Sequence, residues 1–125
     1  MKDCIFCSLP ESRIKKQTEN FNVILDLYPI SEGHTLIIPK KHIQFLRNLK
    51  ENAITELFNL IIELQNEMIE TYKCQDFNIG INEGILAGQT IQHLHIHIIP
   101  RYKGDIDDPR GGVRWIIPDK AKYWD

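Results

Sequence analysis

The sequence has few cysteines, no long apolar run and no excess of positive charge. Its three cysteines are an odd number, which argues against the disulfide framework of a small secreted protein. No stretch of about 18 apolar residues occurs, so we expect no membrane-spanning helix. Lys and Arg number 15 and Asp and Glu number 17, which gives a formal net charge of −2. That balance excludes a protein that coats nucleic acid through general phosphate contacts.

The same features indicate a compartment and a size. The N-terminal residues include no long apolar segment of the kind found in secretory signals, and the cysteine count suits a reducing environment. We therefore expect a cytoplasmic protein. A chain of 125 residues has the length of one domain and can bury roughly two-thirds of its unfolded surface. We expect a single domain over residues 1–125 that needs no disulfides.

Four segments are expected to form β-strands. Each is rich in apolar residues, several of them in alternation, and each ends at proline, glycine or a turn sequence. The segments are residues 21–27, 34–38, 77–82 and 90–99.

Between the second and third of these strands the apolar spacing changes. Apolar residues recur at steps of three and four between residues 48 and 73, with charged and amide side chains in the gaps, which predicts one long amphipathic helix. Asn48 and Glu51 have the spacing of an N-terminal capping pair. Strands on both sides of one helix, joined by short connections, favour an antiparallel α+β domain over a βαβ fold.

The most informative segment is His-Leu-His-Ile-His-Ile-Ile at residues 93–99. Side chains alternate faces along a strand, so His93, His95 and His97 are expected on one face and the aliphatic residues between them in the core. An isolated strand histidine is usually structural, but three in alternation favour chemistry. A neutral imidazole serves either as a metal ligand or in nucleophilic and acid–base catalysis, and both interpretations remain open at this point.

Two further groups of residues accompany the histidines. Asn82, Gln89 and Thr90 are uncharged hydrogen-bonding residues, and Gly88 permits close approach of a ligand to the backbone. Such groups beside imidazoles suit an anionic oxygen such as that of a phosphate. Near the N-terminus, the Cys-x-x-Cys spacing in residues 4–7 predicts either metal ligands or a redox pair.

Together these motifs resemble the histidine-triad (HIT) family. Residues 93–99 match every position of the triad pattern, and residues 33–42, 82–84 and 88–90 resemble other blocks of that family in the same order. The resemblance covers about residues 4–101 and leaves a C-terminal tail over about residues 102–125. It implies a HIT-like antiparallel, meander-type β-sheet with one long amphipathic helix.

The resemblance also implies an activity. Members are nucleotide hydrolases and transferases that act at the α-phosphate of nucleoside phosphoramidates, dinucleoside polyphosphates or related conjugates. By position, His95 would be the nucleophile, His97 would donate to the phosphate or leaving group, and His34 would lie close to both. Histidine rather than glutamine at position 97 favours hydrolysis over transfer. The alternatives are a nucleotidyl transferase and a nucleotide-binding sensor or scaffold with little catalysis.

The nucleotide contacts are carried over in the same way. Asp26 falls where the family holds the ribose, and Leu27 falls near the pocket for a purine base, adenine for example, although a plain core role for Leu27 is equally compatible with the sequence. The residues expected at the phosphate are Asn82, Gly88, Gln89, Thr90 and His97. The tail resembles that of bacterial diadenosine polyphosphate hydrolases.

Finally, the resemblance implies a metal and a partner. Zinc in structural sites takes four tetrahedral Cys or His ligands. Cys4, Cys7, His42 and His93 occupy the positions that hold zinc in some bacterial members, so we expect a structural zinc ion and no organic cofactor. We also expect a homodimer that forms through the long helix and a neighbouring strand, with no membrane or general nucleic-acid partner.

Overall fold

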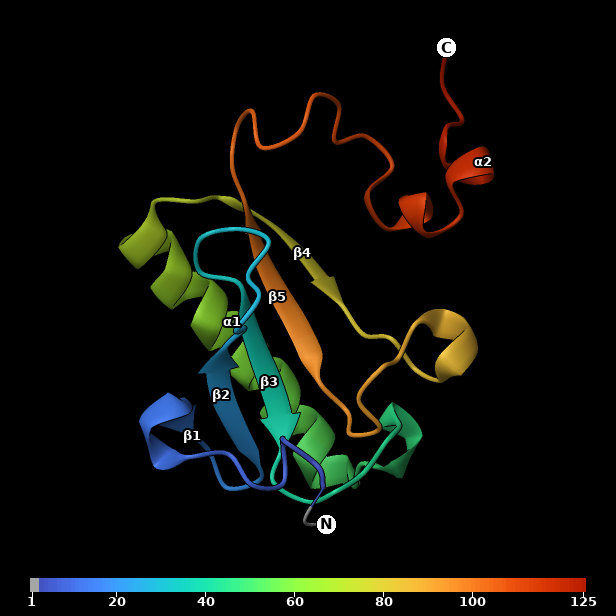
Figure 1. The fold of residues 1–125 in the computed structure, drawn as a ribbon. Helices are drawn as coiled ribbons and strands as arrows, with labels where there is room; N and C mark the ends of the chain where they lie inside the picture. The colour runs from blue at the N-terminus through green and yellow to red at the C-terminus, as the bar shows by residue number, and fades with distance from the viewer. Residues whose placement is uncertain (1–2) are drawn as a thin grey trace.

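The protein folds as a five-stranded antiparallel sheet with one long helix against it, as a computed structural model of residues 3–125 shows (Figure 1). The strand order is β1-β2-β3-β5-β4, so β5 lies between β3 and β4. The elements are β1 (Ile14–Gln17), β2 (Phe21–Leu25), β3 (Thr35–Pro39), α1 (Glu51–Tyr72), β4 (Asp76–Gly80), β5 (Ile96–Arg101) and the short helix α2 (Pro118–Ala121). This arrangement confirms the predicted α+β class.

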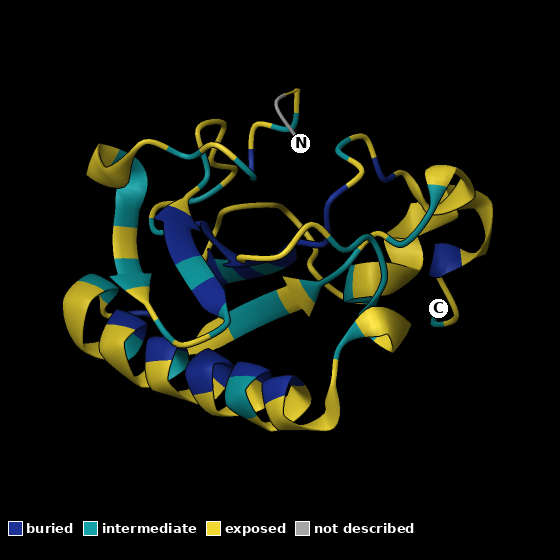
Figure 2. Ribbon diagram, turned by 90° about the horizontal axis from the view of Figure 1, so that it is seen from below, coloured by how far each residue is buried: buried dark blue, intermediate teal, exposed yellow. Residues whose placement is uncertain are grey.

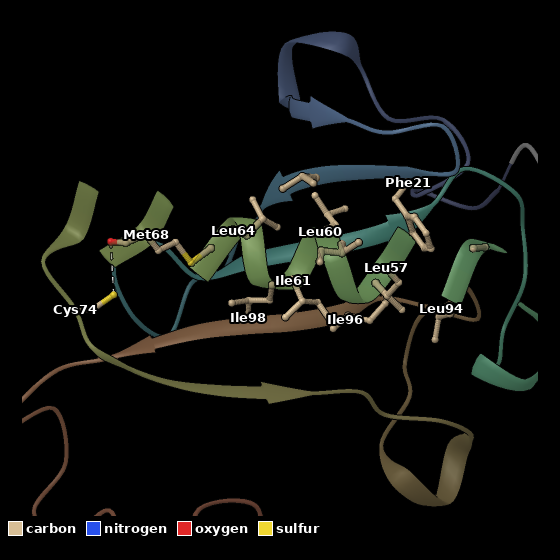
Figure 3. Close-up of a cluster of buried hydrophobic side chains, with 13 residues drawn as sticks. Phe21, Leu57, Leu60, Ile61, Leu64, Met68, Cys74, Leu94, Ile96 and Ile98 are labelled. Carbon is tan, nitrogen blue, oxygen red and sulfur yellow. Dashed lines mark hydrogen bonds between the residues drawn. The ribbon is translucent and has the colours of Figure 1, made fainter. Parts of the chain in front are cut away.

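Helix α1 covers one face of the sheet. Its buried residues lie on the side of the helix that faces the strands, while the residues on its outer side are exposed (Figure 2). Leu57, Leu60 and Leu64 belong to a buried cluster that also contains Ile96 and Ile98 of β5 (Figure 3). Because side chains alternate along β5, this packing turns the intervening histidine to the opposite face of the sheet.

The start of the long helix differs from the prediction. Asn48 ends a short 3-10 turn, and α1 begins at Glu51 after Lys50, which makes no side-chain capping bond. The proposed capping pair of Asn48 and Glu51 is therefore wrong. Glu51 instead lies in the first turn, where a negative charge is favourable near the positive end of the helix dipole.

The histidine-rich strand is shorter than predicted. It begins at Ile96 rather than residue 90, because the backbone N–H of Leu94 donates to the carbonyl of Ile43, at 2.7 Å, instead of joining the sheet. The alternation nevertheless persists into this irregular segment, since Leu94 is fully buried like Ile96 and Ile98. Strand β1, with its short half-exposed sequence, was not predicted.

The C-terminal segment continues beyond the end of β5 as an irregular chain (Figure 1), and its 3-10 turn comes back into contact with β4. It contains a 3-10 turn at Gly112–Ile116 and helix α2, so it has slightly more regular structure than expected. Arg101 anchors the start of this segment through two hydrogen bonds of 2.8 Å to the Asp105 carboxylate. Within residues 3–125, no helix has the length and apolar character needed to cross a membrane.

Candidate active site

A cleft of about 550 Å³ lies on the face of the sheet opposite α1. Its lining includes residues from every strand or strand end except β1, and Arg13 lies directly before β1. Of the residues predicted to act in catalysis or nucleotide binding, all but one line this cleft: Asp26, Leu27, His34, Asn82, Gly88, Thr90, His95 and His97. The exception is Gln89.

Sheet topology gathers these residues from distant parts of the chain. Asp26 follows β2, His34 precedes β3, and His97 lies in β5, where it pairs with Leu36 and Gly80. Because β5 inserts between β3 and β4, the imidazoles of residues 34 and 97 come into contact although 63 positions separate them in sequence.

Hydrogen bonds determine which nitrogen of His97 carries the proton. The backbone N–H of Ile30 donates to Nδ1 of His34 at 3.2 Å, so a neutral His34 carries its proton on Nε2. That nitrogen donates to Nδ1 of His97 at 2.9 Å. His97 therefore has its proton on Nε2, which makes this atom a hydrogen-bond donor.

Burial keeps both imidazoles neutral. Desolvation, with additional repulsion from His95 and His34, lowers the pKa of His97 from 6.5 to about 4. Desolvation also lowers the pKa of His34, and the nearby Asp26 carboxylate, 3.4 Å from Nε2, opposes that decrease. Near pH 7 the pair is therefore uncharged, which is the state that the hydrogen-bond chain requires.

His95 has the complementary arrangement. Its Nδ1 donates to the backbone carbonyl of His93 at 2.9 Å, which leaves a lone pair on Nε2. The residue is only 9% exposed, and its ring lies 5.2 Å from the ring of Phe6 and 5.2 Å from that of His97. A buried imidazole with a free Nε2 lone pair in a cleft has the properties of a nucleophile.

The loop between β4 and β5 supplies the remaining polar lining. Gly84 and Gly88 have φ values of 90° and 91°, which favour glycine. The buried side chain of Gln89 stabilises this turn, since its Oε1 accepts bonds from the Gly84 N–H at 2.8 Å and from the Gln44 amide at 3.2 Å. Gln89 therefore braces the loop in this structure, and Gln44 is a partner that the sequence analysis missed.

The other end of the cleft is partly apolar. Leu27 is 62% exposed and lines the cleft together with Ile5, so it is not a core residue. One carboxylate oxygen of Asp26 accepts the Tyr28 N–H at 2.9 Å, which orients the group at the start of the loop. Arg13, a further lining residue, was not identified from the sequence.

A second cluster lies beside the cleft. The ligand atoms of Cys4, Cys7, His42 and His93 all lie within 4.8 Å of one another. The Cys-x-x-Cys turn is closed by a hydrogen bond from the Cys7 N–H to the Cys4 carbonyl, at 3.1 Å. The four residues that the sequence assigned to a metal therefore meet in space.

The geometry of this cluster fits a tetrahedral metal. Ligands at about 2.3 Å for sulfur and about 2.0–2.1 Å for nitrogen would stand roughly 3.5 Å apart. The sulfur–nitrogen distances are 3.3 Å from Cys4 to His93, 3.1 Å from Cys7 to His42 and 3.6 Å from Cys7 to His93. Nε2 of His93 donates to the Pro39 carbonyl at 2.8 Å, so its Nδ1 lone pair is directed at the sulfurs.

Protonation also bears on this cluster. Burial lowers the pKa of His93, which favours the neutral imidazole that binds metals. Burial and the neighbouring Cys4 thiol raise the pKa of Cys7, so a bound metal must displace its proton. Cys74 lies elsewhere, buried in the cluster beneath α1, and acts as a small apolar residue.

Comparison with known proteins agrees with this geometry. The sequence matches the HIT domain family over residues 10–104. The chain belongs to the HIT family. This HIT protein is 34% identical over 108 residues to a bis(5'-nucleosyl)-tetraphosphatase (asymmetrical) of Schizosaccharomyces pombe, an alignment that covers 86% of the chain but 59% of the relative. It is also 32% identical over 110 residues to the protein hit of Bacillus subtilis, covering 83% and 75%.

Solved structures give the same result. A zinc-bound histidine triad family protein from Mycobacterium smegmatis is 34% identical and superposes with a TM-score of 0.74, covering 83% of this chain and 78% of that one. A HIT family protein from Bacillus subtilis gives a TM-score of 0.76 at 30% identity, covering 82% and 76%. The fold is therefore HIT-like, and the family is one of nucleotide hydrolases and transferases.

Proposed function

We propose that this HIT protein is a hydrolase that cleaves nucleoside phosphoramidates or dinucleoside polyphosphates at the α-phosphate through a nucleotidyl-His95 intermediate. The observation that supports it most directly is the pair of opposite tautomers in one cleft. His95 carries a free lone pair on Nε2, while the neighbouring His97 carries a proton there.

The first step forms a bond to phosphorus. The Nε2 lone pair of His95 attacks the α-phosphorus, and the bond from phosphorus to the leaving group breaks with its electron pair. In the resulting imidazolium, the Nδ1–H of His95 still donates its hydrogen bond to the His93 carbonyl. The carbonyl oxygen therefore stabilises the positive charge that develops on the ring. The Nε2 proton of His97 donates a hydrogen bond to the departing atom, which takes its proton from water.

The second step regenerates the enzyme. Water attacks the phosphorus, the phosphorus–nitrogen bond breaks, and its electron pair returns to Nε2 of His95. The products are a nucleoside 5'-monophosphate and one proton. Histidine at position 97 favours water over another acceptor, as the family resemblance implies, so we propose hydrolysis rather than nucleotidyl transfer.

The cleft also offers groups to hold the substrate. Asn82, Gly88 and Thr90 line it beside the histidines and would contact the phosphate oxygens. We propose that Asp26 accepts hydrogen bonds from the ribose hydroxyls and that Leu27 packs against a purine base. Gln89 would then act through the loop that it braces, with its backbone as the group nearest the phosphate.

The test uses adenosine 5'-phosphoramidate as substrate. We expect release of AMP, with transient label on His95 when the reaction is quenched during turnover and analysed by mass spectrometry. His95→Ala should abolish turnover while circular dichroism stays unchanged, whereas Gln92→Ala, an exposed residue outside the cleft, should retain it. A His95→Ala variant with wild-type turnover, or label on another side chain, would contradict the mechanism.

We propose separately that Cys4, Cys7, His42 and His93 bind one structural zinc ion per chain. The fit of their distances to a tetrahedron and the zinc-bound relative support this proposal. Elemental analysis should find about one zinc per chain. Cys4→Ser should lose it, and the matched variant Cys74→Ser should keep it. Metal-free wild-type protein with two titratable thiols at positions 4 and 7 would refute the assignment. We also propose that the protein resides in a reducing cytoplasm, which would keep Cys4 and Cys7 out of a disulfide and able to bind the metal.

We also propose a homodimer. Strand β4 is an edge of the sheet. On α1, Ile54, Phe58 and Ile62 are 43%, 59% and 56% exposed and form one row at steps of four. Glu63 forms an ion pair with Lys16 of β1, so the side of α1 that carries Glu63 faces β1. The exposed row lies on the other side of the helix, toward β4.

A second copy that pairs along β4 would cover both features at once. Light scattering should therefore give twice the chain mass. Phe58→Glu should halve it, and Asn59→Glu, which adds the same charge outside the row, should not. A monomeric wild type would overturn this proposal without affecting the chemistry.

A further inference from the structure

Arg13 is a cation of the cleft that the catalytic proposal does not use. It ends the 3-10 turn Glu11–Arg13 directly before β1 and is half-buried. One nitrogen, Nη2, donates to the Leu25 carbonyl at 3.1 Å, which fixes the guanidinium next to Asp26. Among residues 3–125, no carboxylate forms an ion pair with it. A guanidinium has five N–H donors, so most of those on Arg13 remain available to a ligand.

The position of Arg13 relative to the reacting histidines follows from the strand order. Arg13 adjoins β1, Asp26 follows β2, His34 precedes β3 and His97 lies in β5, and these strands are consecutive neighbours in the sheet. With strands spaced about 4.8 Å apart, β1 lies roughly 14 Å from β5. The nucleophilic centre therefore lies toward β5, and the guanidinium, which is held at the end of β2 beside Asp26, lies on the β1 side of the cleft.

A bound nucleotide has the same linear order. Its phosphate would lie at the histidines and its ribose at Asp26, as proposed above, so its base must continue toward β1. Ile5 and Leu27 line that end of the cleft and offer apolar surface for the faces of the ring. Arg13 is then the charged group at the edge of the base, where hydrogen bonding rather than stacking distinguishes one purine from another.

We propose that Arg13 is a specificity-determining residue that selects guanine-type bases by donating to their O6 and N7 atoms. This inference rests on the proposed function, because it uses the same placement of the phosphate and ribose. The two acceptors of guanine match the parallel donors of a guanidinium. Adenine keeps the N7 acceptor but presents an amino donor in place of O6, which would face another donor and lose one bond. Hypoxanthine has the same two acceptors as guanine.

The experiment measures affinity by calorimetry with GMP, IMP and AMP, because binding does not require turnover. The wild type should bind GMP and IMP about 10-fold more tightly than AMP. This ratio is in the lower part of the range of base discrimination by a two-bond contact, because one Arg13 nitrogen already donates to the Leu25 carbonyl. Arg13→Ala should reduce this preference to less than about twofold, mainly through loss of affinity for GMP and IMP. Arg47→Ala removes an arginine that stacks on Phe45 outside the cleft, and it should keep the preference.

Three results would overturn the inference: equal affinities in the wild type, an unchanged preference in Arg13→Ala, or IMP that behaves like AMP. A parallel measurement of kcat/KM for guanosine and adenosine 5'-phosphoramidates separates this question from the activity itself. If neither compound is turned over, the hydrolase proposal fails, and the nucleotide affinities still decide the role of Arg13. If both are turned over equally well and bound equally well, the hydrolase proposal stands and the selectivity of Arg13 is rejected.

Discussion

The partly buried His97 should make the folded protein sensitive to mild acid. Its pKa is lowered to about 4, while the same side chain in the unfolded chain keeps its ordinary value of 6.5. Between these two pH values His97 is protonated in the unfolded state but not in the folded state, so the free energy of unfolding falls as the pH falls through this window. Below about pH 4 both states are protonated and the loss is complete.

The size of the effect follows from the two pKa values. One pKa unit corresponds to about 1.4 kcal/mol, so the full loss is about 3 kcal/mol. At pH 5, part of the way through the window, the linkage relation gives a loss of about 2 kcal/mol relative to pH 7.5. For a domain of this size that is a substantial part of the total free energy of unfolding.

Urea unfolding followed by circular dichroism at pH 7.5 and pH 5 measures this loss. Since His34 and His93 also have lowered pKa values, the contribution of residue 97 is isolated by the difference between wild type and His97→Gln. The glutamine oxygen can still accept the bond from Nε2 of His34, but it does not titrate. We expect the wild type to lose about 2 kcal/mol more than the variant. Equal losses in both proteins, or an NMR titration that places His97 near 6.5, would refute the reasoning.

Three further predictions concern single residues. His34→Ala should lower kcat/KM about 10-fold and alter its pH profile, because the hydrogen bond that fixes the tautomer of His97 is lost; His34→Gln, which keeps a donor, should restore part of the lost kcat/KM. Glu56→Ala should lower the free energy of unfolding, measured in urea, by about 1–3 kcal/mol, because the Glu56 carboxylate accepts hydrogen bonds from the turn at residues 18–20. Since the pKa of Glu56 is lowered in the folded protein, the difference in stability between wild type and variant should shrink as the pH falls below about 4.5. Gly33→Ala should lower the melting temperature, since φ is +88° and the new Cβ would lie 2.7 Å from the Tyr72 ring, which must move.

Local patterns in the sequence were sufficient for the main elements. The three- and four-residue periodicity predicted α1 to within three residues at its start. The alternation in residues 93–99 correctly separated the core side chains from those on the opposite face, where His95 and His97 line the cleft and His93 faces the cysteines. Both patterns reflect burial, which is a property of consecutive residues. The capping pair at Asn48 was wrong because capping depends on where the preceding 3-10 turn places the backbone.

The remaining features depend on contacts between distant segments. Gln89 is held by Gln44, and the bond from Leu94 to the Ile43 carbonyl ends the regular strand early. Arg13 enters the cleft only because β1 pairs with β2, and β1 itself has no apolar alternation to reveal it. The tautomers of His95 and His97 were equally inaccessible, since they depend on backbone groups that the sequence does not distinguish.

His93 serves two neighbours through different atoms. Its ring faces the cysteine sulfurs, and its main-chain oxygen holds the imidazole of His95. No amino-acid replacement can delete that oxygen, so the alignment of the attacking group is insulated from mutation as long as the backbone path is kept. The cysteine cluster secures the same short stretch of chain from the other side. Damage to the cysteine cluster should therefore affect the reaction by shifting the peptide unit of His93. The His95 imidazole would then gradually lose its alignment, although every reacting atom would still be present.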